Sequence, residues 1–225
     1  MTGSDRRTIL KALVATLAGL SVGGLDASAA SASAASASAA SAASESWTTQ
    51  TLGAFADTLI PGERRSPGDM VIAGAVTGPG AVQAGVVTLL HSPELPVAPL
   101  LPAIAALLDA RAVAYAALRL IWLSPSRPPF VGLSFADRTA LVGGLFDPDD
   151  LDRPIWQVMS LLVGLAFDTA GQQDTVEALA QGHPGLTWLR FPEPDADGLW
   201  RFPDFSYGRP LAALHPNTTA SGSPA

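Results

Sequence analysis

The sequence predicts an all-α protein: a single helical bundle of about five to six helices with an extended aromatic C-terminal arm, preceded by a signal peptide and an Ala/Ser-rich linker. Apolar residues recur at three- and four-residue spacing through the middle of the chain, which is the period of an amphipathic helix. No run alternates polar and apolar residues as a half-buried strand would. Hydrophobic residues make up 48% of the 225 positions and charged residues only 15%, a balance that suits a packed core rather than a disordered chain.

The N-terminal residues resemble a twin-arginine (Tat) signal. Residues 5–11 read Asp-Arg-Arg-Thr-Ile-Leu-Lys, and the uncharged stretch 12–25 is too short to span a bilayer comfortably. Asp5 and Ile9 depart from the consensus, whereas four positions match it: Arg6, Arg7, Leu10 and Lys11. We favour a Tat signal over an ordinary Sec signal because the arginine pair stands in register with the leucine and the lysine.

Three Ala-Ser-Ala triplets follow, and each offers the small residues that a signal peptidase requires. Their last residues are the cleavage candidates Ala29, Ala34 and Ala39. We therefore interpret 1–29 as the Tat signal peptide and 30–46 as a flexible linker. The chain is expected to cross the membrane folded and to work as a secreted, periplasmic or envelope-associated protein. A permanent membrane anchor is the alternative, and the cleavable triplets argue against it, so no stable transmembrane helix is expected after cleavage.

The helical domain is expected over 47–184. Its first helix begins at the cap Thr48 and ends at the Pro-Gly pair 61–62, before a loop over 63–78. One apolar stripe runs along this helix: Leu52, Phe55, Ala56, Leu59 and Ile60. Asp57 points away from the stripe, so we expect it to bond loop amides near Gly62 or to pair with an arginine, without a catalytic role.

The middle of the domain predicts two further helices. Pro79 fits the first position of a helix that runs to about Leu90. The segment 99–123 is rich in Ala and Leu and could be mistaken for a membrane span. It contains charged residues, Asp109 and Arg111 among them, which are costly in lipid, so a buried helix of a bundle is expected.

Three helices are predicted in the last part of the domain. Ser134 and Asp137 resemble a capping pair that opens a helix through about Phe146. Pro154 starts a helix that is apolar nearly all round, which predicts a place in the centre of the bundle. A shorter helix over 174–181 ends at a glycine.

Residues 185–215 are expected to form an extended arm, and 216–225 a disordered tail. Six aromatic residues fall in this arm between prolines, a spacing that no helix can absorb: Trp188, Phe191, Trp200, Phe202, Phe205 and Tyr207. One interpretation is that the arm wraps its own bundle and completes the core. The other is that these aromatic side chains anchor a partner protein, since large flat side chains dominate interface energies. Both interpretations can hold for different residues.

The sequence contains no recognisable set of reacting groups. The excess of acids, 20 Asp and Glu against 13 Lys and Arg, repels nucleic-acid backbones. The absence of Cys excludes disulfides and thiolate catalysis. The three histidines, His91, His183 and His215, lie next to prolines or one residue away and lack a second ligand at metal-binding spacing, so we expect loop caps. The acidic run 147–152 lacks the glycine and the distant glutamate of a calcium loop. We assign no catalytic, cofactor-binding or metal-binding residue.

Residues 51–62, Thr-Leu-Gly-Ala-Phe-Ala-Asp-Thr-Leu-Ile-Pro-Gly, resemble the opening of the gluconate 2-dehydrogenase subunit 3 family, where a helix ends in Ala-Asp-Thr-Leu-Ile-Pro before a Gly/Pro loop. A later pattern before a helix is also similar: Phe130, Leu133, Arg138 and Leu145. The resemblance covers about 51–165 and is closest to small neighbours of glucose–methanol–choline flavin oxidoreductases.

This resemblance implies a non-catalytic accessory subunit. In that family the small subunit carries the Tat signal, binds the folded FAD-loaded catalytic subunit, and takes it through the Tat translocase. This chain would then bind no cofactor directly, and FAD would lie in the flavoprotein partner. Two alternatives stay open: a stand-alone secreted enzyme of an unrecognised type, and an exported scaffold or binding domain.

Overall fold

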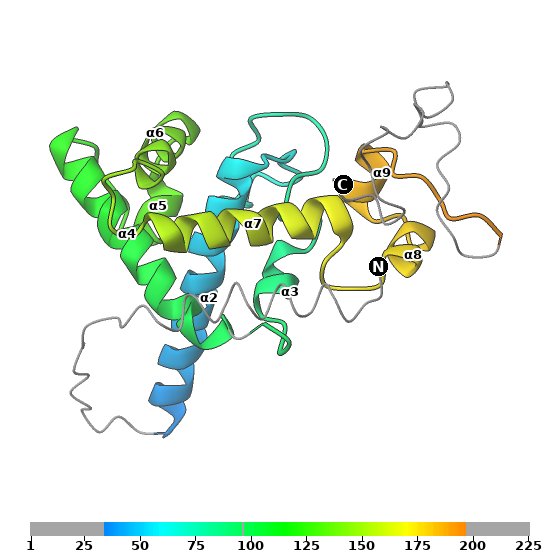
Figure 1. Ribbon diagram of the computed structural model, residues 1–225. Coiled ribbons are helices and arrows are strands. Elements are labelled where there is room, and N and C mark those ends of the chain that lie inside the picture. The colour runs from blue at the N-terminus through cyan, green and yellow to red at the C-terminus, as the bar shows by residue number, and fades with distance from the viewer. Residues whose placement is uncertain (1–33, 96, 197–225) are drawn as a thin grey trace, which may run out of the picture. The chain divides into compact units, whose positions relative to one another are not determined.

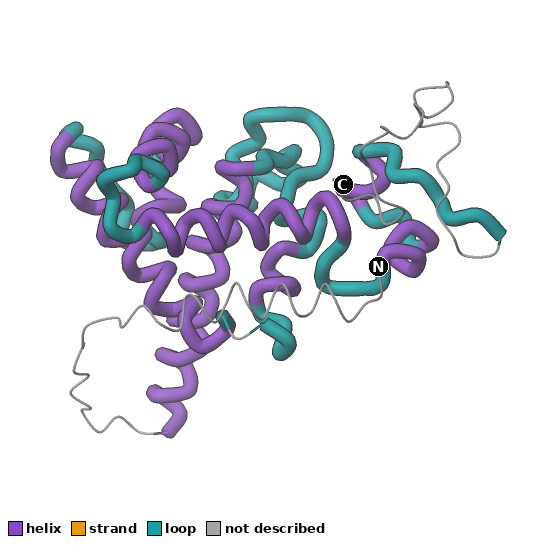
Figure 2. The backbone as a smooth tube through the Cα atoms, viewed as in Figure 1, coloured by secondary structure: helices purple, strands orange, loops and turns teal. Residues whose placement is uncertain are grey.

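A computed structural model describes residues 34–95 and 97–196 of the chain. Within these residues the secondary structure consists of eight α-helices and one short 3-10 helix, and no strand is present (Figures 1 and 2). The all-α prediction is confirmed, with more short helices than the five to six expected. Most of the described chain belongs to one compact unit that extends to Phe191, and 192–196 belong to a second unit.

The first described helix, α2 (Ala34–Leu59), begins earlier than predicted. The Ala/Ser-rich residues from Ala34 onward continue the helix, so the prediction of a flexible linker over 30–46 is wrong for this part. Alanine has the highest helix propensity, and extension of an existing helix is far easier than nucleation. Thr48 therefore lies inside the helix instead of capping it. The cleavage candidates Ala34 and Ala39 lie in α2 as well, whereas Ala29 lies outside the described residues.

The second half of α2 is the centre of the bundle. From Thr51 to Asp57 its residues are buried on every side. Five helices contact it: α3 (Val86–Leu90), α4 (Leu101–Leu118), α5 (Pro129–Gly132), α6 (Phe135–Leu145) and α7 (Arg153–Thr169). The apolar character of α7 had predicted a central place for that helix. Instead α7 exposes Gln157 and Leu161 on one face and packs its other face on the core through Trp156 and Met159.

Helix α4 follows a 3-10 turn, η1 (Ala98–Leu100), and lines one side of α2. Its carboxylate Asp109 accepts hydrogen bonds from the Thr51 hydroxyl at 3.0 Å and from the Phe130 backbone N–H at 2.9 Å. These bonds join α2, α4 and α5. Among the described residues, one segment, Ala98–Leu118, is long and apolar enough by length and composition to cross a membrane. The predicted helix over 99–123 ends early because Leu120 takes a left-handed backbone conformation, with φ of 55°.

The predicted cap of α6 is confirmed, since the Ser134 hydroxyl accepts a hydrogen bond from the Asp137 N–H. The prediction of a helix from Pro79 to Leu90 is wrong in its first half. Residues 81–85 form turns, and α3 begins only at Val86 because Gly85 adopts φ of 88°. A left-handed residue interrupts the helical hydrogen-bond ladder, and glycine takes that conformation at little cost.

Two short helices, α8 (Thr175–Ala180) and α9 (Pro184–Trp188), follow α7. Asp174 caps α8 through bonds to the N–H groups of the next turn. Helix α9 occupies the start of the predicted extended arm, so that prediction is wrong for 185–188. A small apolar cluster explains the helix, because Leu186 is buried against Ala170 and Ala178. Helix α9 also contacts α7, which makes it part of the bundle.

Candidate functional site

The loop 61–80 is held against the bundle by a buried carboxylate. Asp57 sits near the end of α2 and accepts one hydrogen bond per oxygen, from the Gly62 N–H at 3.0 Å and from the Ala73 N–H at 2.8 Å. The predicted bond to loop amides near Gly62 is thereby confirmed. Desolvation by burial raises the pKa of Asp57 above its ordinary value, although the two backbone hydrogen bonds and the charge of Arg138 act in the opposite direction.

Arg138 holds the other side of the same loop. Its guanidinium is buried and donates to three backbone carbonyls: Met70 at 3.2 Å, Val71 at 2.8 Å and Val131 at 2.6 Å. Burial lowers the pKa of Arg138 to about 10, and the negative charge of Asp57 opposes that shift. Asp57 and Arg138 make no direct ion pair; each satisfies backbone groups of the loop instead. The arginine that carries part of the family resemblance therefore has an architectural role.

Close backbone contacts fix the two ends of this loop together. A Cβ on Gly80 would lie 2.5 Å from the Gly62 nitrogen, and a Cβ on Gly62 would lie 2.8 Å from the Gly80 nitrogen. Only glycine permits this approach. The Glu63 N–H also donates to the Gly78 carbonyl at 2.7 Å. The loop is consequently a fixed structure with a defined surface.

Helices α8 and α9 are attached to the turn before α3 through the Ala84 carbonyl. The His183 Nε2 lies 2.9 Å from this oxygen, and the Gln172 Nε2 donates to it at 2.8 Å. The His183 Nδ1 accepts from the Leu186 N–H at 3.3 Å and caps α9. With Nδ1 as acceptor, Nε2 carries the proton and donates to Ala84. The prediction of a capping histidine is confirmed for His183.

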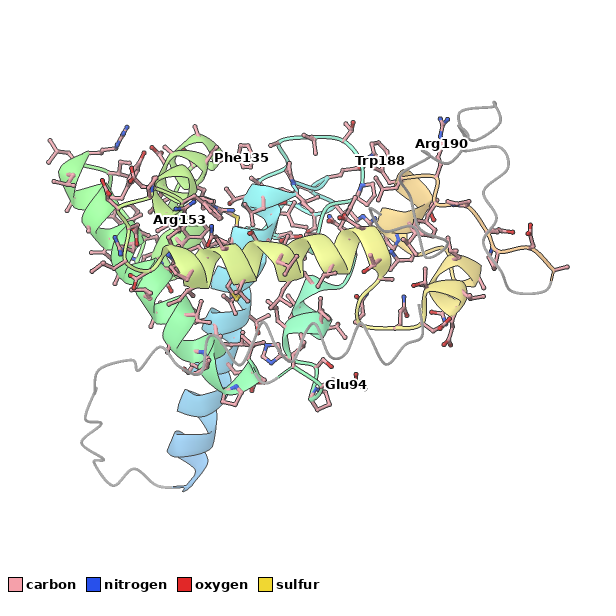
Figure 3. The ribbon with its side chains drawn as sticks, in the orientation of Figure 1. Glu94, Phe135, Arg153, Trp188 and Arg190 are labelled. Carbon is pink, nitrogen blue, oxygen red and sulfur yellow. The ribbon has the colours of Figure 1, made fainter. Side chains whose placement is uncertain are left out.

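The loop 61–80 and α9 meet at Trp188. A Cβ on Gly78 would lie 2.9 Å from two ring carbons of Trp188, so the indole rests directly on this glycine. Figure 3 labels Trp188 at the end of α9, with Arg190 beyond it. Trp188 is nevertheless 59% exposed. A depression borders the indole and is lined by Arg65, Pro79, Gly182, Pro184, Thr187, Trp188 and Arg190. The indole is therefore exposed and held in position, and two arginines line the depression beside it.

The other predicted partner-binding residues divide into two groups. Phe191 is half-buried and packs against the small cluster of Ala170, Ala178 and Leu186, which matches the interpretation that the arm completes its own core. The remaining four lie outside the described residues: Trp200, Phe202, Phe205 and Tyr207. The Tat motif also lies outside them: Arg6, Arg7, Leu10 and Lys11.

The acidic run 147–152 and His91 have their contacts elsewhere, whereas His183 lies at the start of α9 beside this surface. Asp150 and Asp152 form ion pairs with Arg111, at 3.2 Å and 2.7 Å, which join α4 to the start of α7. His91 is exposed at the end of α3, and His215 lies outside the described residues. Over 34–95 and 97–196, no group of three or more His, Asp or Glu side chains gathers in a metal-binding arrangement.

Sequence reasoning identified Trp188 and missed its neighbours. Arg65 and Gly78 come from the loop, more than 100 residues before Trp188 in the chain, and no local pattern links them. The glycine-rich composition of the loop was the available signal, because such loops permit close approach of another element.

Comparison with known proteins gives one match. The sequence model of a family described as "Family of unknown function (DUF5987)" matches residues 46–225. No curated protein and no solved structure matches the chain.

Proposed function

The chain belongs to the DUF5987 family, whose description assigns no function, and from this premise we propose that it is a non-catalytic accessory subunit. In this proposal it escorts a folded FAD-dependent dehydrogenase or oxidase through the Tat translocase and stabilises it outside the cytoplasm. The leader motif at Arg6 and Arg7 supports export, and the resemblance of residues 51–62 to gluconate 2-dehydrogenase subunit 3 supports a flavoprotein partner.

The fixed, exposed indole of Trp188 is the observation that carries the proposal. Its ring rests on Gly78 and is flanked by Arg65 and Arg190 in a shallow depression. Tryptophan and arginine are the residues most often found at the energetic centre of protein interfaces. An indole that is already held in place loses little conformational entropy when a partner covers it. The partner surface that fits here is apolar at its centre and acidic at its edge.

The roles of the buried polar side chains also favour an architectural protein. Asp57, Arg138 and His183 each bond backbone groups of a loop or a turn. Asp109 bonds a backbone N–H and a threonine hydroxyl. Asp57, Arg138 and His183 hold the loop 61–80 and α9 in the arrangement that presents Trp188, and Asp109 joins α2, α4 and α5. The hydrogen-bonding capacity of these side chains thus serves the architecture and leaves little for a reacting molecule.

The experiment is capture of a flavoprotein. A leaderless glucose–methanol–choline flavoprotein from the same genome is co-expressed with the tagged chain, and co-purified FAD is measured by absorbance. Trp188→Ala should weaken capture about 30-fold, since loss of a central aromatic anchor costs about 2 kcal/mol or more. Trp188→Phe keeps an aromatic ring and should retain most of the binding.

Leu151→Ala is the matched surface control, because Leu151 is 92% exposed and lies in the acidic run away from α9 in the sequence. It should leave capture unchanged. The proposal fails if the wild-type chain captures no flavoprotein, or if Trp188→Ala captures as much as Leu151→Ala does.

A further inference from the structure

A second apolar surface lies at the end of α4. Three large side chains at the last residue of this helix and just after it are largely exposed: Leu118 at 88%, Leu120 at 94% and Trp122 at 79%. We call residues 118–122 the α4 tip. Scattered single apolar residues are common on protein surfaces, but three large ones within five residues are not. Trp188 and the loop 61–80 contribute none of them, and α4 and α9 lie at opposite ends of α7 (Figure 1), so the α4 tip is separate from the surface assigned to the partner.

The backbone conformation of Leu120 costs folding free energy that its exposed side chain does not recover. The Ile121 N–H donates to the Ala116 carbonyl at 2.9 Å, and Leu120 between them has φ of 55°. This is the helix-ending turn in which glycine is the preferred left-handed residue. Leucine is strained there, and its exposed side chain recovers nothing by packing within the described residues. The side chain is therefore available to a surface outside this part of the chain.

The charges around the α4 tip are positive, in contrast to the chain as a whole. Residues 112–136 contain Arg119 and Arg127 and no Asp or Glu, whereas the formal net charge of the chain is −7. The Arg119 guanidinium carbon lies 4.6 Å from the centre of the Tyr115 ring. One acidic side chain, Asp137, is linked to this region, because it accepts a hydrogen bond from the Tyr115 hydroxyl at 3.2 Å.

We propose that the α4 tip docks peripherally on an anionic lipid surface. Leucine side chains can enter the acyl boundary, and tryptophan prefers the level of the headgroups. Arg119 and Arg127 would then face lipid phosphates, with their aliphatic stems along the apolar region. A second copy of the chain fits less well, because a two-fold contact at the α4 tip brings Arg119 of each copy together. This proposal goes beyond the partner-binding function and does not depend on it.

The chain offers a matched control for the apolar part of this proposal. Leu151 is 92% exposed, almost the same as Leu120. It lies between acidic residues that repel anionic lipid: Asp147, Asp149, Asp150 and Asp152. The two leucines therefore have nearly the same exposure but differ in the charge of the residues around them. Binding to anionic lipid should depend on Leu120 and not on Leu151.

The test is cosedimentation of the exported chain with vesicles of phosphatidylglycerol and phosphatidylcholine, or of phosphatidylcholine alone. Leu120→Gly should reduce binding to the anionic vesicles about tenfold, since it removes one buried leucine side chain. It also supplies the residue that the turn prefers, so the fold is kept. Leu151→Gly should leave binding unchanged, and Arg119→Glu with Arg127→Glu should abolish the preference for anionic vesicles.

Three results would overturn the proposal. The first is failure of the wild-type chain to sediment with the anionic vesicles. The second is equal binding to neutral and anionic vesicles, or equal effects of Leu120→Gly and Leu151→Gly. The third is unchanged vesicle binding in Leu120→Gly together with weaker capture of the flavoprotein or dissociation of a dimer of the chain. The α4 tip would then belong to a protein interface. Loss of flavoprotein capture in Trp188→Ala bears only on the partner-binding proposal.

Discussion

Replacement of Asp57 by alanine tests whether a single buried carboxylate holds the loop 61–80 in place. The substitution removes the acceptors of two backbone N–H groups, those of Gly62 and Ala73. Hydrogen bonds to a charged group contribute about 1.5–3 kcal/mol each, so the two bonds together contribute about 3–6 kcal/mol. Burial of the carboxylate opposes this gain, which is why its pKa is raised. We therefore expect Asp57→Ala to lower the free energy of unfolding by about 2–4 kcal/mol.

The assay is urea unfolding followed by fluorescence of the five tryptophans, with the slope of the transition checked for constancy. Asp57→Asn should fall between wild type and Asp57→Ala, because the amide oxygen still accepts one N–H while the amide nitrogen faces the other. Hydrogen exchange adds a local readout. The Gly62 and Ala73 amides should exchange much faster in Asp57→Ala, whereas the Phe130 amide, which bonds to Asp109, should change only as much as global stability does.

Two results would refute the reasoning about Asp57. One is a change in the free energy of unfolding below about 0.5 kcal/mol, the range of ordinary surface substitutions. The other is equal acceleration of exchange at the Gly62, Ala73 and Phe130 amides, which would mean that the loop is not held by this carboxylate in particular.

Four other substitutions test the docking of Trp188, the helix α6, the buried carboxylate of Asp109 and the turn at Leu120. Gly78→Ala should displace the Trp188 ring and weaken flavoprotein capture, because the new Cβ lies 2.9 Å from the ring and Gly78 has a φ of 109°. Gly143 has open space around it, so Gly143→Ala should stabilise α6 by about 0.5–1 kcal/mol and leave capture unchanged. Burial raises the pKa of Asp109, so the folded state binds the carboxyl proton more tightly than the unfolded state does. The free energy of unfolding should therefore fall as the pH rises from about 4 towards the raised pKa. Asp109→Asn should flatten that part of the pH profile of urea unfolding. Leu120→Gly should raise the free energy of unfolding by about 1 kcal/mol, since it relieves a left-handed leucine; a lower midpoint in urea would contradict that explanation.

Local signals predicted the parts of the fold that depend on local chemistry. The Ser134 cap and the bond from Asp57 to the Gly62 amide both involve residues within five positions of each other. The start of α2 was predicted wrongly because an Ala/Ser-rich segment cannot fold by itself and was therefore expected to be flexible. Alanine nevertheless extends a helix whose other end is already packed in the bundle. The start of α3 was misjudged because the left-handed conformation of Gly85 is not visible in the apolar period.

The candidate site depends on contacts that no local pattern encodes. Trp188 was predicted as one of six aromatic residues of the arm that pack on the bundle or bind a partner. Its contact with Gly78 follows from the attachment of α9 to the turn at Ala84, 99 residues before His183. The α4 tip was missed for another reason. Leu118 and Leu120 continue an apolar segment that predicts burial. Leu118 nevertheless lies on the exposed face of α4, and Leu120 lies in the left-handed turn that ends the helix.

Export of the flavoprotein partner is the property on which the accessory-subunit proposal depends. A leaderless glucose–methanol–choline flavoprotein is expressed with the wild-type chain or with Arg6→Lys and Arg7→Lys together, and its FAD-dependent activity is measured inside and outside the cytoplasm. We expect active flavoprotein outside only with the wild-type chain, and folded, active flavoprotein retained inside with the double variant. Equal amounts of active flavoprotein outside in both strains would contradict it.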